Sequence, residues 1–375
     1  NGTIQNSGTA MGTGDSNIGF NTGPAGTARN LSGTVTISGN TLSNAYQHGI
    51  DIVNYSGTVV DLAIVGNTIT SSTSTSASTG SGIRVQVRGS AGATAHLTQA
   101  LITGNQVRNF PSGAGIQVEG GNTTAGGPMA TVGVPGSATD VIAITNNRIS
   151  GQASARIGTG AIITAVTGRG QGNFDVSGNG TAADPIAYSA GTAIQHSALG
   201  QVTVTTRVAN NHISANNLFG SQGIGVGADA FFGATDAPVL DVAVTGNTVS
   251  NTDGNGILAV ARGSAATMRA TVQGNSVAAP LTGVRPGIRV DAGSAVGNVS
   301  VCLDIAGNTS AGSGGGRGIG LRKQGTNPAV NAFAVDGMVA TATPGVEAYV
   351  DSMNPAGGLT QLLSATSGFS NCTLP

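Results

Sequence analysis

The chain has 375 residues and a formal net charge of −1; 62 of its residues are Gly, 8% are charged and 3% are aromatic. This composition is unlike that of an ordinary globular domain, its scattered arginines exclude nucleic acid as a partner, and no apolar run reaches the roughly 18 to 20 residues of a membrane-spanning helix. Val, Ile and Thr recur at regular intervals, which favours an ordered β-protein over a disordered chain.

The first expected elements are two short strands. Asn1-Gly2-Thr3-Ile4 and Asn17-Ile18 match the two signals that recur through the rest of the chain. A first coil of this kind exposes unpaired backbone and apolar side chains. We therefore expect the N-terminal coil to contact a second copy of the chain or an upstream part of the same chain.

A Gly-Asn or Asn-Asn pair then ends one β-like run after another. Its irregular spacing fits the variable loops of a β-helix better than the tighter periods of propellers or leucine-rich repeats. Asn tolerates left-handed backbone at a sharp corner, and its amide can hydrogen-bond to the equivalent Asn in the coils above and below. The predicted asparagine ladder consists of Asn40, Asn67, Asn105, Asn147, Asn179, Asn211, Asn247, Asn275 and Asn308.

Three residues before each of these asparagines stands Ile or Val, as expected of a side chain that points inward in every coil. The predicted core ladder consists of Ile37, Ile64, Ile102, Ile144, Val176, Val208, Val244, Val272 and Ile305. Two residues after the Asn the positions are mostly apolar, with Thr181 and Ser310 as exceptions.

A second set of strands begins at a recurring Gly-Ile, where the glycine indicates a positive φ or a close backbone approach. Its members are Ile50, Ile83, Ile116, Ile224, Ile257, Ile288 and Ile319, with Ile162 and Ile194 as looser members. Alternation after each Ile predicts half-buried strands. Together these patterns predict an all-β chain, a right-handed parallel β-helix of about nine or ten coils over residues 1–324. Longer loops are expected at 70–82, 119–139, 180–192 and 227–239.

From residue 325 the repeat fails, and residues 325–375 are predicted to form a C-terminal cap. Residues 344–353 are typical of a short helix and residues 361–366 of a strand. Cys302 occupies an outward position of the last coil, so a tail folded back over the rod can join Cys372 to it in a disulfide. An oxidising compartment follows, and hence an extracellular or cell-surface location.

Over about residues 17–324, these ladders resemble those of right-handed parallel β-helix proteins of bacterial surfaces, the pectin-lyase-like group that includes autotransporter passengers and repeat-rich adhesins. The group contains adhesins, fibres, polysaccharide lyases and hydrolases. The resemblance therefore implies the fold and a secreted or surface location, and is weak for activity.

An enzyme of this fold would carry carboxylates, often with Arg or Lys, on outward positions of adjacent coils, where they could act on a sugar chain or bind Ca²⁺. The best such cluster is Asp51, Arg84, Gln86, Gln117 and Glu119. Only two of these are carboxylates and neither lies in a recognisable motif. A solvated polar face is the simpler interpretation.

Other candidate ligands are weaker. His48, His96, His196 and His212 stand in unrelated registers, and the oxygen-rich turn at residues 251–256 has a composition that also simply makes turns. No cofactor or metal is predicted. The sparse charged side chains favour an extracellular structural or adhesive rod, a fibre subunit or part of a longer surface protein. The alternative is a carbohydrate-active enzyme or a polysaccharide-binding β-helix.

Overall fold

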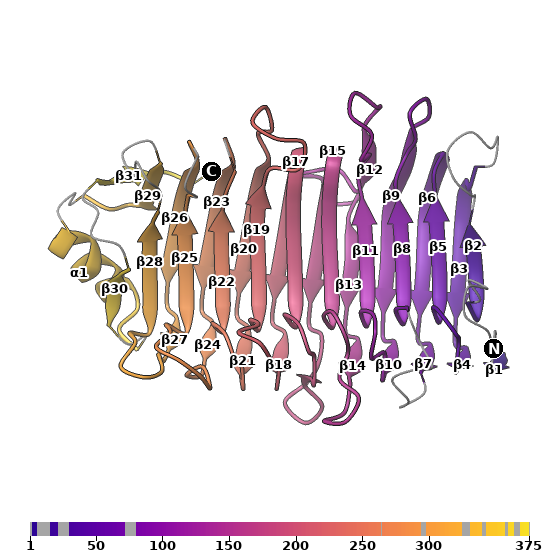
Figure 1. Ribbon diagram of the computed structural model, residues 1–375, viewed down its shortest axis with the longest axis horizontal. Coiled ribbons are helices and arrows are strands. Elements are labelled where there is room, and N and C mark those ends of the chain that lie inside the picture. The colour runs from indigo at the N-terminus through magenta and orange to yellow at the C-terminus, as the bar shows by residue number, and fades with distance from the viewer. Residues whose placement is uncertain are drawn as a thin grey trace.

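The computed structural model describes residues 2–5, 16–21, 30–71, 80–263, 265–293, 298–324, 331–339, 343–356, 359–363 and 368–374. In this part of the chain, short and long strands stack side by side along one long axis, with β1 and β2 at one end and helix α1 (Thr343–Met353) at the other (Figure 1). Neighbouring strands pair in parallel. The fold is a right-handed parallel β-helix, as predicted. None of the described helical residues forms a segment long and apolar enough to cross a membrane.

The strands form three rows that run along the axis. The corner sheet contains β1 (Thr3–Gln5), β4 (Thr41–Ser43), β7 (Thr68–Thr70), β10 (Gln106–Arg108), β14 (Arg148–Ser150), β16 (Ile186–Ala187), β18 (His212–Ser214), β21 (Thr248–Ser250), β24 (Ser276–Val277) and β27 (Thr309–Ser310). The first row contains β2 (Ile18–Asn21), β5 (Ile50–Asn54), β8 (Ile83–Val87), β11 (Ile116–Gly120), β19 (Ile224–Asp229), β22 (Ile257–Ala261), β25 (Ile288–Ala292), β28 (Ile319–Lys323) and β30 (Thr360–Leu362).

The second row contains β3 (Gly33–Ser38), β6 (Gly57–Val65), β9 (Ala95–Thr103), β12 (Ala130–Val132), β13 (Ile142–Thr145), β20 (Val239–Thr245), β23 (Thr267–Gln273), β26 (Ser300–Ala306), β29 (Ala332–Asp336) and β31 (Phe369–Cys372). Strands β15 (Ile162–Ser177) and β17 (Ile194–Ala209) run through both rows and join them. Residues 119–139, which were predicted to form a loop, contain the strand β12.

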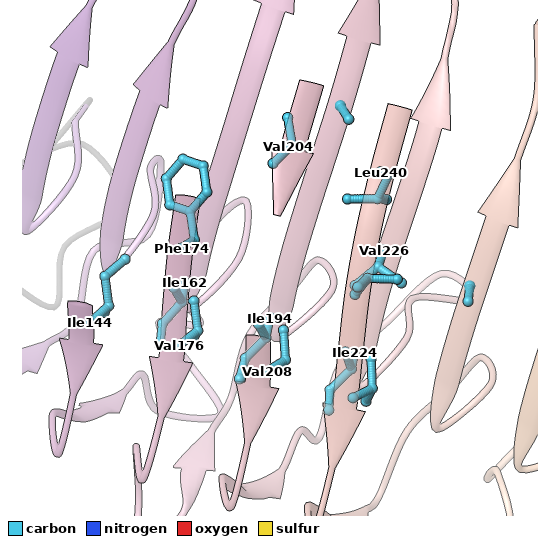
Figure 2. Packing of buried hydrophobic residues seen from close by; sticks show 14 of the residues in the cluster. Ile144, Ile162, Phe174, Val176, Ile194, Val204, Val208, Ile224, Val226 and Leu240 are labelled. Carbon is cyan, nitrogen blue, oxygen red and sulfur yellow. The ribbon is translucent and has the colours of Figure 1, made fainter. Parts of the chain in front are cut away.

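The core ladder lies in register through the second row. Ile37 pairs with Ile64, Ile64 with Ile102, and the series continues without a break to Ile305. All nine side chains are buried. The Gly-Ile ladder is in register from Ile18 to Ile319 in the first row. In Figure 2, Val176 and Val208 point into the same interior as Ile162 and Ile194.

The asparagine ladder follows the turn between the second row and the corner sheet. Oδ1 of Asn147 accepts the backbone N–H and the side-chain amide of Asn105, both at 3.0 Å. Its Nδ2 donates to Oδ1 of Asn179 at 3.0 Å and to the carbonyl of Ile102 at 2.9 Å. All the hydrogen-bonding positions of this buried amide are therefore filled. The other interior members repeat the same bonds.

The left-handed residue of each turn is the one before the ladder Asn, which corrects the conformational role expected for that Asn. Gly66 has a φ of 63° and Asn146 has a φ of 54°, whereas Asn67 and Asn147 do not have positive φ. Gly and Asn both tolerate this conformation. This explains why the repeated pair is Gly-Asn or Asn-Asn.

The glycine of the Gly-Ile signal acts through close approach, not through positive φ. A Cβ at Gly82 would lie 2.3 Å from Cγ1 of Val107 and 2.7 Å from the carbonyl oxygen of Gly115. The same crowding occurs at Gly115, where the nearest atom belongs to Ile149. A side chain here would collide with the corner sheet of the next coil.

Thr181 does not take the inward corner position that its spacing predicts. Ile186 pairs with Ile213 and is fully buried, so the chain makes an excursion over residues 180–185 before it enters β16. Because of this insertion, the inward corner residue no longer lies two residues after Asn179. Ser310 does occupy the expected position, opposite Val277, and is buried.

Parallel pairing also continues past residue 324, where the sequence signals stop. β29 pairs with β26, β31 with β29, and β30 with β28. Phe333 and Val335 are buried in register with Val301 and Leu303 of β26, without a Gly-Asn pair. The strand predicted at residues 361–366 is observed as β30, at Thr360–Leu362, and residues 364–366 lie outside the described residues.

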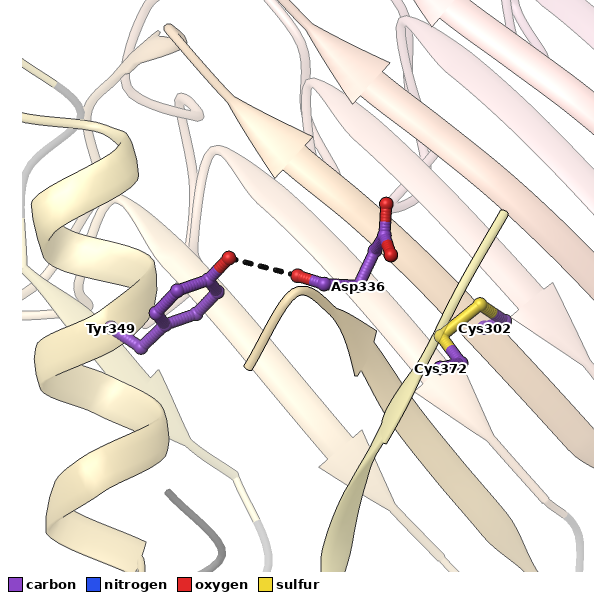
Figure 3. Close-up of a disulfide and its surroundings, with 4 residues drawn as sticks. All are labelled: Cys302, Asp336, Tyr349 and Cys372. Atoms are coloured by element: carbon purple, nitrogen blue, oxygen red, sulfur yellow. Dashed lines mark hydrogen bonds between the residues drawn. A yellow bond between two sulfur atoms is a disulfide. The ribbon is translucent and has the colours of Figure 1, made fainter. Parts of the chain in front are cut away.

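Helix α1 and the tail close this end of the rod. Asn354, just after the helix, continues the asparagine ladder by accepting both amide donors of Asn308 at 2.9 Å. Figure 3 shows the Cys302–Cys372 disulfide and the hydrogen bond from the Tyr349 hydroxyl to the carbonyl of Asp336. Because β29 lies between β26 and β31, the disulfide ties the tail back across one strand.

Candidate functional site

The outward cluster predicted from the sequence comes together on the first row. Arg84 pairs in register with Asp51 on one side and Gln117 on the other, and Gln86 pairs with Glu119. Successive side chains of a strand alternate between faces, so residues that share a register position on adjacent strands project side by side. The three strands β5, β8 and β11 therefore present one polar surface, but Asp51 and Gln86 are buried within it, so the expected solvated polar face is wrong for these two residues.

The groups of this surface bind one another. Nε and Nη2 of Arg84 donate to the two carboxylate oxygens of Asp51 at 2.7 and 2.9 Å. Oε1 of Glu119 accepts from Gln117 at 2.7 Å, and Oε2 accepts from Gln86 at 2.9 Å. Oγ of Ser81 donates to Gln117 at 3.0 Å. Each carboxylate oxygen thus has a donor within the cluster.

A cleft of about 370 Å³ opens beside this network, bounded by Gln47, His48, Gly80, Ser81, Arg84, Ser112, Gly113, Gln117, Glu119, Thr159 and Ile163. His48 was not associated with the cluster from the sequence. His48 lies two residues before Ile50, at the corner where the first row begins. This position is the sequence signal that could have placed His48 beside the cluster.

His48 is held as a neutral hydrogen-bond acceptor. Its Nδ1 accepts the backbone N–H of Ser81 at 2.8 Å. Burial lowers the pKa of His48 to about 4, and the nearby Arg84 guanidinium adds to the effect. With Nδ1 as the acceptor, the proton of the neutral ring is on Nε2.

This arrangement is suited to binding and poorly suited to proton transfer. General acid–base catalysis needs a carboxyl or imidazole group within reach of the reacting atom and free to exchange its proton. Asp51 is held by Arg84, Glu119 by two amides, and Nδ1 of His48 by a backbone donor. The cleft can therefore offer hydrogen bonds to a polar ligand from a rigid wall.

The remaining histidines lie elsewhere. His96 is in β9 and His212 in β18. His196 is fully buried, with Nδ1 2.8 Å from the Thr164 hydroxyl and Nε2 3.0 Å from the Thr206 hydroxyl. Its ring meets Phe174 edge-on at 5.3 Å, and burial lowers the pKa of His196 to about 3. It is a neutral core residue.

The turn at residues 251–256 holds neighbouring loops together. Asp253 accepts the backbone N–H of Gly220, and the Thr282 hydroxyl donates to Asp253 at 3.0 Å. The amide of Asn255 donates to the carbonyl of Pro286 at 2.6 Å. Within the described ranges, no three or more His, Cys, Asp or Glu residues are grouped so as to hold a metal ion.

No family model, no curated protein and no solved structure matches the chain. The resemblance to bacterial surface β-helices is supported by the fold. No relative lends this chain an activity, a ligand or a location.

Proposed function

We propose that this protein is an extracellular structural or adhesive rod. The observation that carries the proposal is the unbroken asparagine ladder from Asn40 to Asn354, in which the buried amides bind their neighbours along the axis. A buried polar network with every member satisfied makes a core rigid and specific. Such a ladder supports a role in holding surfaces at a fixed distance.

The outer face supports the same role, because several of its charged groups pair with one another. Besides Asp51 and Arg84, Asp175 pairs with Arg207 at 2.9 Å, and Arg269 donates to both oxygens of Asp241. Charges paired in this way stabilise the fold more than they attract or activate a charged substrate. The disulfide is compatible with an extracellular location or a cell surface.

The rod is also proposed to associate through its N-terminal coil, as a fibre subunit or as the continuation of a longer surface protein. Among the described residues, β1, β2 and β3 have a strand partner on one side only. An unpaired edge of this kind is a template for further pairing. Concentration-dependent light scattering of the 375-residue chain should show association, and a monomer at every concentration would contradict the fibre interpretation.

The second candidate function is polysaccharide binding or processing at the cleft beside Arg84 and Glu119, favoured by its volume and its rigid hydrogen-bonding wall. Product release from a panel of polysaccharides distinguishes the two functions. If the protein is a structural rod, the wild-type chain should release no product. The variants Asp51→Asn and Glu119→Gln should likewise release none. Turnover that these variants abolish, and that a matched Asp175→Asn variant retains, would replace the structural proposal with an enzymatic one.

A further inference from the structure

A trough of about 480 Å³ lies on the outer face of the second row, away from the Arg84 cluster. It crosses four consecutive coils, from β6 through β9 and β13 to β15. Its lining comprises Asp61, Gln99, Ala100, Leu101, Ala138, Thr139, Val141, Ala143 and Asp175. The sequence pattern did not single out this group, because its wall is a turn at residues 134–140 that carries none of the repeated signals.

The floor of the trough is apolar and its two ends are acidic. Leu101 is a large apolar side chain that is 44% exposed, and it pairs with Ala143 in the next coil. Asp61 lies at one end beside Gln99, its register partner. Asp175 lies at the other end as the register partner of Ala143.

One wall of the trough is a rigid turn. Nδ2 of the buried Asn173 donates to the carbonyls of Val134, Ser137 and Asp140 at 2.9, 2.8 and 3.2 Å. The Ser137 hydroxyl oxygen also accepts the backbone N–H of Asp140 at 3.0 Å. The trough is therefore shaped before any ligand arrives, which lowers the entropic cost of binding.

The polar groups of the trough differ from those of the Arg84 cluster in having unused capacity. Over the part of the chain that the structure describes, neither Asp61 nor Gln99 has a side-chain hydrogen bond or ion pair. Asp175 uses Oδ1 to accept from Arg207 at 2.9 Å, and its Oδ2 has no donor in the same ranges. The trough thus presents acceptors at both ends and no cation between them.

We propose that this trough binds a linear aliphatic polyamine. One ammonium group binds Asp61 and the Gln99 side-chain oxygen, the methylene chain lies on Leu101, Val141 and Ala143, and a second ammonium group binds Oδ2 of Asp175. Three strand spacings separate β6 from β15, about 14 Å, which an extended triamine spans with its central ammonium group turned away from the apolar floor toward water. A charged hydrogen bond at each end and apolar contact in the middle are the contacts that distinguish such a ligand from an inorganic cation.

The test is calorimetric titration of the full chain with spermidine at low ionic strength. Spermidine should bind, and Asp61→Asn should weaken its binding roughly tenfold, the loss expected for one charge-assisted hydrogen bond. Asp140→Asn is the matched control, because it removes the same charge from the wall of the trough without altering the lining. Its affinity should stay at the wild-type value.

A second variant, Leu101→Lys, places a cation on the apolar floor and should abolish spermidine binding. Leu101 and Asp61 are partly exposed, so thermal unfolding should show both variants folded. Three outcomes would overturn the proposal: no binding by the wild-type chain, equal weakening by Asp61→Asn and Asp140→Asn, or equal binding of Mg²⁺ and spermidine to the same site.

Discussion

Asn146 and Asn147 are adjacent residues with different physical roles. Asn146 supplies a φ of 54°, a conformation that Gly adopts at the equivalent position of most coils. Asn147 supplies the ladder amide, and its loss would leave the two amide donors of Asn105 without an acceptor. Each unsatisfied buried group costs about 1 to 3 kcal/mol.

The same substitution at both positions therefore separates conformation from hydrogen bonding. Asn147→Gly should lower the free energy of unfolding by at least about 3 kcal/mol, whereas Asn146→Gly should leave it nearly unchanged. Denaturant unfolding of the two variants measures the difference. Equal losses would mean that the ladder amide contributes no more than its neighbour.

The lowered pKa of His48 predicts that the fold loses stability in mild acid. This pKa is lowered to about 4 in the folded chain, mainly by burial, from its ordinary value of 6.5. Between these values the unfolded chain takes up a proton that the folded chain does not, so the contribution is complete above pH 6.5 and is lost as the pH falls to about 4. The loss is about 3 kcal/mol, and buried His196 acts in the same direction.

His48→Asn keeps an acceptor for the Ser81 N–H and removes one titrating group. Unfolding free energies measured from pH 7 to pH 4 should fall less steeply for this variant than for the wild-type chain. A wild-type slope retained in full by His48→Asn would show that His48 does not carry the effect.

At the scale of elements, the sequence was most informative where one offset recurs in every coil. Ile and Val at the core-ladder position could be assigned because a one-residue shift would turn the whole strand inside out. Ile186 could not, because the excursion after Asn179 changes the count. β29 and β31 lack the Gly-Asn and Gly-Ile signals, so their parallel pairing is visible only in three dimensions.

The two candidate sites also differ in how far the sequence predicts them. The Asp51, Arg84 and Glu119 cluster follows from register alone, since its members share two positions in consecutive coils. The trough at Asp61 depends on a turn that Asn173 holds against the second row. Such a wall is set by long-range contacts, which no local pattern encodes.

The tail is the element whose attachment is most readily tested. β31 pairs only with β29 among the described strands, and the rings of Phe333 and Phe369 are 5.0 Å apart. With Cys302→Ser and Cys372→Ser together, β31 should open locally, and amide exchange at residues 332–336 should rise. Exchange at β13, in the middle of the rod, should not change. A uniform increase in both regions would mean that the disulfide stabilises the whole fold and not the tail.

Across the whole molecule, each repeat advances the chain by one coil along a straight axis. In a solenoid, each coil contacts only its neighbours, so length accumulates in equal steps. The corner sheet contains ten strands in sequential order, and the spacing of strands in a sheet makes its length about 43 Å. The exposed residues Thr68, Thr248 and Thr309 occupy one register column of this sheet.

Distances between spin labels at cysteines introduced in this column measure that advance, with the native disulfide left intact. Thr248 lies five strands beyond Thr68, and Thr309 lies seven strands beyond it. The β-helix therefore predicts backbone separations of about 24 Å for Thr68–Thr248 and about 34 Å for Thr68–Thr309. Separations that fail to grow with the number of strands, or a Thr68–Thr309 distance no longer than Thr68–Thr248, would contradict the solenoid.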